Sequence, residues 1–124
     1  MTLLLVMIGA SIGAPSRWLL DQTISSRNAR AFPLGTWTIN IIGSLLLGFI
    51  VAASAFGPAT VTLVALAGTG FCGGFTTFST FGFETIRLAE EGSPFEAGLN
   101  VVSSLAVGLV AAAAGGYLGQ AIWT

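Results

Sequence analysis

From residue 31 to residue 83 the chain has 53 consecutive residues without a charged side chain. Two further uncharged stretches cover residues 1–16 and 97–124. A helix needs about 20 predominantly apolar residues to cross the hydrocarbon core of a bilayer. The longest stretch is therefore long enough for two crossings. Only 7% of the residues are charged, against about 25% in soluble domains. The sequence predicts an all-α integral membrane protein.

Loops and turns divide the chain into four predicted transmembrane helices, at about residues 2–20, 34–56, 60–83 and 95–123. A polar loop over residues 21–33 ends at a proline, Gly57-Pro58 predicts a tight turn, and residues 84–94 form another polar segment. We expect a single membrane domain over residues 1–124, with both termini on one side. The N-terminal stretch has no basic residue before its apolar run, so we interpret it as a retained helix.

The charged residues are concentrated on one side of the predicted bundle. The loop between the second and third spans, FGPAT, carries no charge. Because loops rich in Lys and Arg tend to stay in the cytoplasm, we expect the charged side to be cytoplasmic and both termini to lie outside. The charged residues are Arg17, Asp21, Arg27, Arg30, Glu84, Arg87, Glu90, Glu91 and Glu96.

The composition excludes several classes of function. Net charge is −1 and there is no Lys, so no basic surface for nucleic acid is expected. The absence of His, with Cys72 as the single cysteine, removes most haem, zinc and copper sites. We interpret Cys72 as a small buried side chain. No carboxylates are spaced for acid–base catalysis and no nucleophile has a candidate base, so we expect no enzyme.

The third span contains an unusual segment, GTGFCGGFTTFSTFGFE, over residues 68–84. The pair Gly73-Gly74 is poor helix material, because each Gly costs about 1 kcal/mol relative to Ala. One interpretation is a glycine-rich helix that packs closely. The other is a helix broken in mid-membrane, whose freed backbone carbonyls can hold a cation.

Small residues at four-residue spacing predict close contacts between helices. Four thin helices enclose little volume, so a permeation pathway would require oligomerisation. The spaced residues are Gly9 and Gly13 in the first span, Ser44 and Gly48 in the second, and Ser104, Gly108, Ala112 and Gly116 in the fourth.

Aromatic and hydroxyl residues alternate in the second half of the third span. Phe78 and Phe81 lie on one helical face, and Phe71 and Phe75 extend roughly the same stripe. Such a stripe is usually core packing. Ring edges carry partial positive charge, however, and together with hydroxyl donors they can solvate a small anion weakly enough for it to leave. The interleaved hydroxyl residues are Thr76, Thr77, Ser79 and Thr80.

A few polar residues within or beside the spans have two interpretations each. Asn40 can make an interhelical contact or donate to an anion in a pore, and the same holds for Asn100 and Ser104. Arg17 can extend toward the interface or form the floor of an anion vestibule. Glu84 ends the predicted third span and can be a solvated carboxylate.

Three blocks of sequence carry a resemblance to a known family. They are GASIGAPSRW from residue 9, FPLGTWTINIIGSLLLGF from residue 32 and GFCGGFTTFSTFGFE from residue 70. The sequence resembles the Fluc/CrcB family of small bacterial fluoride channels. The resemblance implies a fluoride-selective channel in the bacterial plasma (inner) membrane that lets toxic cytoplasmic fluoride leave passively. It also implies an antiparallel, dual-topology dimer with two fluoride pathways along the subunit interface.

The resemblance implies roles for individual residues. Phe78 and Phe81 resemble the aromatic pair that contacts fluoride, and Asn40 resembles the pore asparagine. The backbone carbonyls of Gly73 and Thr76, from both subunits, resemble the ligands of one structural Na⁺ ion at the dimer centre. Other implied positions are the hydroxyl track at Ser79 and Thr80, the serine at Ser104, and the vestibule residues Arg17 and Glu84. Asn100 stands where the family often has Tyr; it keeps a donor for the anion but loses the aromatic contact.

Some alternatives stay open. A dual-topology homodimer usually has balanced charge, whereas the one-sided arginines also suit an antiparallel heterodimer with a paired paralogue that inserts the other way. A proton-coupled multidrug exporter has a similar length but needs a membrane-embedded carboxylate, and the first span has none before Asp21. A structural membrane subunit would leave the phenylalanine and hydroxyl block unexplained.

Overall fold

The computed structural model describes residues 2–27 and 32–123, and this part of the chain is helical with no strand. Four segments within it are long and apolar enough to cross a membrane, which confirms the predicted all-α membrane fold. The third of them, Val61–Glu90, is built from four shorter helices. The elements are α1 (Thr2–Ser26), α2 (Leu34–Phe56), α3 (Val61–Leu63), the π-helix η1 (Val64–Cys72), α4 (Gly73–Phe75), α5 (Ser79–Glu90) and α6 (Pro94–Trp123).

Two of the predicted loops are partly helical. α1 continues past residue 20 to Ser26, and α5 continues past residue 83 to Glu90. The loops predicted over residues 21–26 and 84–90 were therefore wrong. Hydropathy marks where a helix leaves the hydrocarbon, whereas a helix ends where its backbone bonds stop, so the ends of the membrane spans themselves stay a prediction. The bounds of α2 agree with the prediction, and the predicted turn follows it at Gly57-Pro58. Arg30, predicted to lie in the first loop, is outside the described residues.

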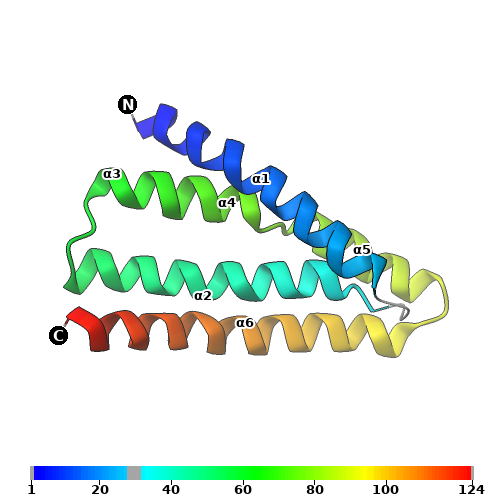
Figure 1. Cartoon of the computed structure of the whole chain (residues 1–124). Coiled ribbons are helices and arrows are strands. Elements are labelled where there is room, and N and C mark those ends of the chain that lie inside the picture. The colour runs from blue at the N-terminus through cyan, green and yellow to red at the C-terminus, as the bar shows by residue number, and fades with distance from the viewer. Residues whose placement is uncertain (1, 28–31, 124) are drawn as a thin grey trace.

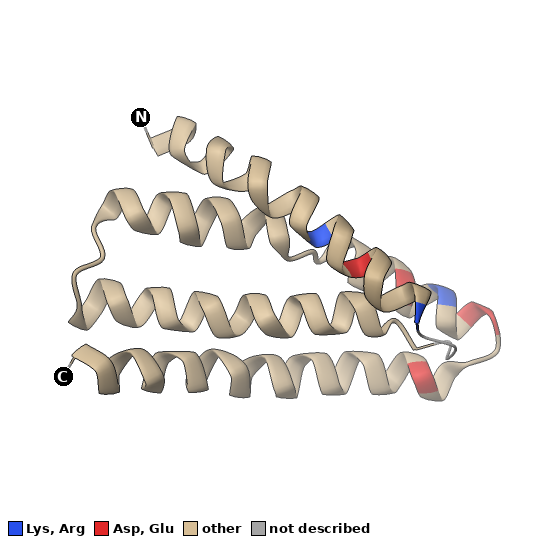
Figure 2. Cartoon of the chain, in the orientation of Figure 1, with Lys and Arg blue, Asp and Glu red and all other residues tan. Residues whose placement is uncertain are grey.

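Figure 1 shows α2 between α6 on one side and η1 and α4 on the other. α1 crosses η1 and α4 obliquely, and α5 packs against α6. Both termini lie at the same end of the bundle, as predicted (Figure 1). The charged residues of the described chain gather toward the opposite end (Figure 2). The asymmetry expected from the sequence is therefore present in the fold.

Large apolar side chains face outward along the helices. Leu3 and Leu109 are each 73% exposed and Val61 is 82% exposed. An apolar surface this extensive is unfavourable in water but matches lipid chains. Together with the four apolar spans, it identifies a multi-pass membrane protein.

Glycines allow the helices to approach closely. A Cβ atom on Gly9 would overlap the carbonyl oxygen of Leu66, and one on Gly13 would overlap that of Phe71. The first-span glycines therefore form the predicted kind of contact, and α1 lies directly on the backbone of the third span. Backbone contact at this distance lets van der Waals packing hold two apolar helices together in lipid.

α6 uses a neighbouring set of small residues. A Cβ on Gly115 would overlap the carbonyl oxygen of Leu45, whereas one on Gly116 would lie 3.9 Å from its nearest neighbour, an ordinary contact. Of the predicted series, Ala112 meets Gly48 directly. The close approaches at Gly115 and Gly119 continue the face of Ala112 at three- and seven-residue spacing, which the strict four-residue spacing from Ser104 did not follow.

Candidate functional site

The third span is interrupted near its middle. α4 ends at Phe75, Thr76 has an extended backbone with φ −87° and ψ 163°, and α5 begins at Ser79. Gly73 and Gly74, where the break was expected to begin, are still helical. A Cβ on Gly74 would lie only 3.0 Å from the Cα of Ala10, so this glycine serves close packing. The non-helical residues are 76–78, which follow the glycine pair after the helical Phe75.

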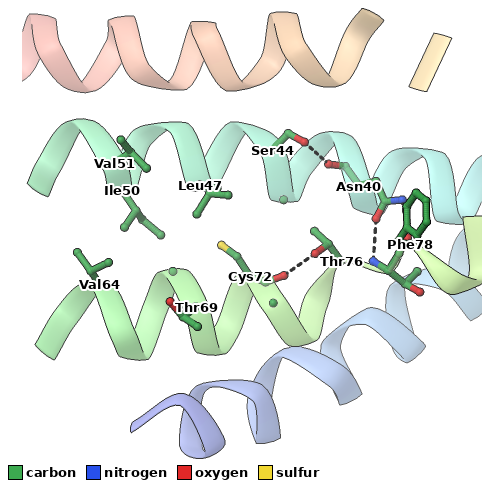
Figure 3. Close-up of a pocket in the computed structure, with 14 residues that line it drawn as sticks. Asn40, Ser44, Leu47, Ile50, Val51, Val64, Thr69, Cys72, Thr76 and Phe78 are labelled. Carbon is green, nitrogen blue, oxygen red and sulfur yellow. Dashed lines mark hydrogen bonds between the residues drawn. The ribbon is translucent and has the colours of Figure 1, made fainter. Parts of the chain in front are cut away.

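Asn40 of α2 holds the backbone at this break. Its Oδ1 accepts a hydrogen bond from the Thr77 amide at 3.0 Å, and its Nδ2 donates to the Thr77 carbonyl at 2.9 Å. Figure 3 shows the Asn40 side chain pointing toward the break, beside Phe78. The carboxamide thus replaces backbone partners that the interrupted helix cannot supply, which is what a non-helical segment at membrane depth requires.

Several backbone carbonyls lose their helical donors at the break, and those of Gly73 and Thr76 are among them. In a continuous helix the Thr77 amide would bind the Gly73 carbonyl, but it binds Asn40 instead. The Thr80 amide would bind the Thr76 carbonyl, but it donates to the Thr77 hydroxyl at 3.2 Å. The oxygens of Gly73 and Thr76 are therefore released from the regular helical pattern, while the Thr76 hydroxyl donates back to the Cys72 carbonyl at 2.8 Å (Figure 3).

The hydroxyl residues gather at the start of α5. The Thr77 hydroxyl donates to the Thr80 hydroxyl at 3.2 Å and lies 3.4 Å from that of Ser79. Thr77 connects these groups, although from the sequence it was expected only as one of the interleaved hydroxyls. Its position three residues before Thr80 is the spacing at which a threonine caps the start of a helix, and this signal could have singled it out.

The four phenylalanines form two separate pairs. The rings of Phe78 and Phe81 have centroids 5.9 Å apart and are inclined by 42°. Phe71 and Phe75 stack at 5.5 Å, and Phe75 is buried. The single stripe expected from the sequence was wrong because the break lies between the pairs. Phe78 is 82% exposed, so most of its side chain is accessible on the surface of a single chain.

A pocket of about 570 Å³ lies between α2 and the third span. It combines predicted site residues from the break with apolar side chains farther along both helices, as Figure 3 shows. Phe81, Ser79, Thr80, Arg17, Glu84, Asn100 and Ser104 do not line it. The predicted site residues in its lining are Asn40, Gly73, Thr76 and Phe78.

The predicted vestibule residues lie on α1 and α5. The Thr36 hydroxyl, on a residue only 3% exposed, donates to Glu84 Oε1. Glu84 is therefore inside α5 and bonded to α2, not a carboxylate at a helix end. The Nε of Arg17 is buried and has no hydrogen-bond partner among the described residues. Both interpretations of Arg17 stay open.

Asn100 is enclosed within the chain, at 1% exposure. Its Nδ2 donates to the Thr85 hydroxyl at 2.8 Å, and the Ser104 hydroxyl donates to its Oδ1 at 3.3 Å. The pathway role predicted for Asn100 and Ser104 stays a prediction. Within one chain, their side chains connect α6 to α5.

Comparison with known proteins places the sequence in a family. Residues 4–116 match the family model described as "CrcB-like protein, Camphor Resistance (CrcB)". The chain belongs to the CrcB family. All predicted site residues of this CrcB chain fall within the matched region.

Relatives of the CrcB chain extend over nearly its whole length. A protein of Streptomyces avermitilis named "Fluoride-specific ion channel FluC 1" is 46% identical over 123 residues, which are 99% of each chain. One of Nocardia farcinica with the same name is 51% identical over 88% of this chain and 75% of its own. "Fluoride-specific ion channel FluC 2" of Mycobacterium tuberculosis is 44% identical over 93% of this chain and 88% of its own.

The hydrogen bonds between Asn40 and Thr77 predict that replacing Asn40 destabilises the folded protein. Asn40→Ala should lower the free energy of unfolding by about 1–3 kcal/mol, because it leaves the partly buried amide and carbonyl of Thr77 without their partners. Ser44→Ala is the matched control, since the Ser44 hydroxyl bonds only to the Asn40 carbonyl of its own helix. Thermal unfolding in detergent micelles measures both variants. Equal melting temperatures for the two would contradict the assigned role of Asn40.

Proposed function

We propose that this protein is a fluoride-selective channel that lets cytoplasmic fluoride leave down its electrochemical gradient across the bacterial plasma membrane. Membership of the CrcB family, with relatives named fluoride-specific ion channels, supports this function. The observation that carries the mechanism is the neutral break held by Asn40, with the Phe78 and Phe81 rings beside it. Amide and hydroxyl donors and ring edges can replace part of the hydration of a small anion.

The fluoride pathway would run along α5 from the break. Phe78 and Phe81 would contact the ion with their ring edges, and Asn40 would line the same passage. The hydroxyls of Ser79 and Thr80 lie at the start of α5, where the helix N-terminus also favours negative charge. Arg17 and Glu84 would flank the aqueous entrance, and no enzymatic step is involved.

A second subunit would complete the pathway. Phe78 is largely exposed on one chain, and the pocket beside it lies between α2 and the third span. An antiparallel dimer would cover both and create two equivalent pathways. Exposed aromatic and small residues at membrane depth suit such packing between helices.

One Na⁺ ion at the dimer centre would hold the two breaks together. The carbonyls of Gly73 and Thr76 fit this assignment, because both are released from helical bonding. Unwound carbonyls are the oxygen ligands that bind Na⁺ within membranes. The ion would serve structure and would not be transported.

Ion release from liposomes tests the proposed function. Vesicles that contain the purified protein and are loaded with KF should release fluoride when valinomycin is added, because charge must be balanced. Vesicles loaded with KCl should retain chloride under the same conditions. Ion-selective electrodes measure both. Equal release of the two anions, or release of neither, would refute the proposal.

The aromatic pair can be tested separately. Phe81→Ile should reduce fluoride flux about tenfold or more, the effect of losing an interaction worth roughly 1.4 kcal/mol at the barrier. Phe83→Ile is the control, because Phe83 lies on the same helix, is 65% exposed and belongs to neither ring pair. Flux per dimer is measured after size-exclusion chromatography. Undiminished flux through Phe81→Ile would exclude a pathway role for that ring.

Membrane orientation decides which dimer forms. We propose a homodimer, for which reporters fused to the C-terminus should detect that terminus on both sides of the membrane. Alkaline phosphatase is active outside the cytoplasm and green fluorescent protein inside it, so both fusions should give signal. The charged end shown in Figure 2 opposes this dual insertion. Signal from one fusion alone would contradict the homodimer and require an oppositely inserted paralogue.

A further inference from the structure

A chain of side-chain hydrogen bonds connects α6 to the start of α5. The Ser104 hydroxyl donates to Asn100 Oδ1 at 3.3 Å, and Asn100 Nδ2 donates to the Thr85 hydroxyl at 2.8 Å. The Thr85 hydroxyl in turn donates to the backbone carbonyl of Phe81 at 2.8 Å. The series ends at one of the two rings beside the break.

The direction of this series is fixed by chemistry. A threonine hydroxyl has one hydrogen to donate, and that of Thr85 goes to Phe81. Its oxygen therefore accepts from Asn100, whose amide nitrogen can only donate. An apolar residue at position 100 would leave the Thr85 oxygen without this donor.

The burial of Asn100 makes this bond structurally important. Asn100 is 1% exposed, so if its carboxamide lost a hydrogen-bond partner, water could not take that partner's place. α5 packs chiefly on α6, and its first turn follows directly on the non-helical residues of the break. The hydrogen bond between Asn100 and Thr85 joins α6 to α5 one turn after Phe81. It therefore fixes the position of the first turn of α5, which contains Phe81.

We propose that Asn100 is a positioning residue that acts through Thr85 to keep the Phe81 ring opposed to Phe78, at the observed 5.9 Å. The inference rests on the proposed function, in which these two rings contact fluoride. It differs from the pathway role predicted from the sequence, because Asn100 then affects permeation without touching the ion.

Three variants test the series. Asn100→Leu removes the donor at similar volume, Thr85→Val removes the hydroxyl, and Thr85→Ser retains it. Ser103→Ala is the control on α6, since its hydroxyl accepts from Trp37 at 3.0 Å and, among the described residues, donates to Leu99 of its own helix instead of to α5. Thr23→Val is the control for threonine, because Thr23 makes the same local bond to a carbonyl four residues earlier, at 2.9 Å.

Two measurements are made on each purified dimer. The first is the ratio of fluoride to chloride flux from liposomes. The second is the ¹⁹F chemical shift of 4-fluorophenylalanine incorporated at position 81, which reports the surroundings of the ring whether or not the protein conducts. Failure of wild-type flux would refute the proposed function, while the ¹⁹F shift would still test the positioning role.

Asn100→Leu and Thr85→Val should each reduce fluoride flux about threefold to tenfold, the range for one interhelical hydrogen bond in a membrane. The double variant should lose no more than either single variant, because both break the same series. The ¹⁹F shift should move in both variants and stay unchanged in Thr85→Ser and the two controls. A loss of flux in Asn100→Leu with full flux in Thr85→Val would overturn the proposal and favour direct contact with the ion. An unmoved ¹⁹F shift in both variants would also overturn it.

Discussion

The arrangement of the third span depends on the two hydrogen bonds between the Asn40 carboxamide and the Thr77 backbone. In hydrocarbon a helix can stop and restart only where another group takes over its backbone bonds. Asn40 does this from α2. Because the span is interrupted at this point, its first half packs on α1 and its second half on α6. The same interruption separates the four phenylalanines into two pairs and releases backbone carbonyl oxygens, those of Gly73 and Thr76 among them, from the helical pattern.

Neutral groups surround this break. The described residues from Gly73 to Phe81 carry no formal charge, and Asn40 adds a dipole without adding one. A fully charged site would hold a small anion tightly and slow its exit. Amide hydrogens, hydroxyls and ring edges bind an anion more weakly than a charged side chain does. The low dielectric around the break makes these neutral interactions stronger than they would be in water. The lack of charge that marks the chain as a membrane protein is therefore also part of the proposed permeation mechanism.

The spans could be predicted from the sequence because crossing a bilayer fixes both the length and the apolar character of a helix. The bounds of α2 followed from Pro33 and Gly57-Pro58, since proline and glycine disfavour continuation of the helical backbone. The extension of α1 to Ser26 could not be predicted, because polar residues are compatible with both helix and loop. Asn40 could be singled out as a polar residue within a predicted span, but its partner depends on how two spans meet. The same reason hid the roles of Thr85 and Gly115, which depend on contacts with distant residues.

The central claim, passive and selective movement of fluoride, is tested most directly by the reversal potential of the purified protein in a planar bilayer. Under a tenfold fluoride gradient with equal pH on both sides, the potential should be about 59 mV and should follow the fluoride gradient alone. It should stay the same when a pH gradient is added at constant fluoride. A reversal potential that shifts with the pH gradient would contradict the account and indicate proton coupling, as in an exporter.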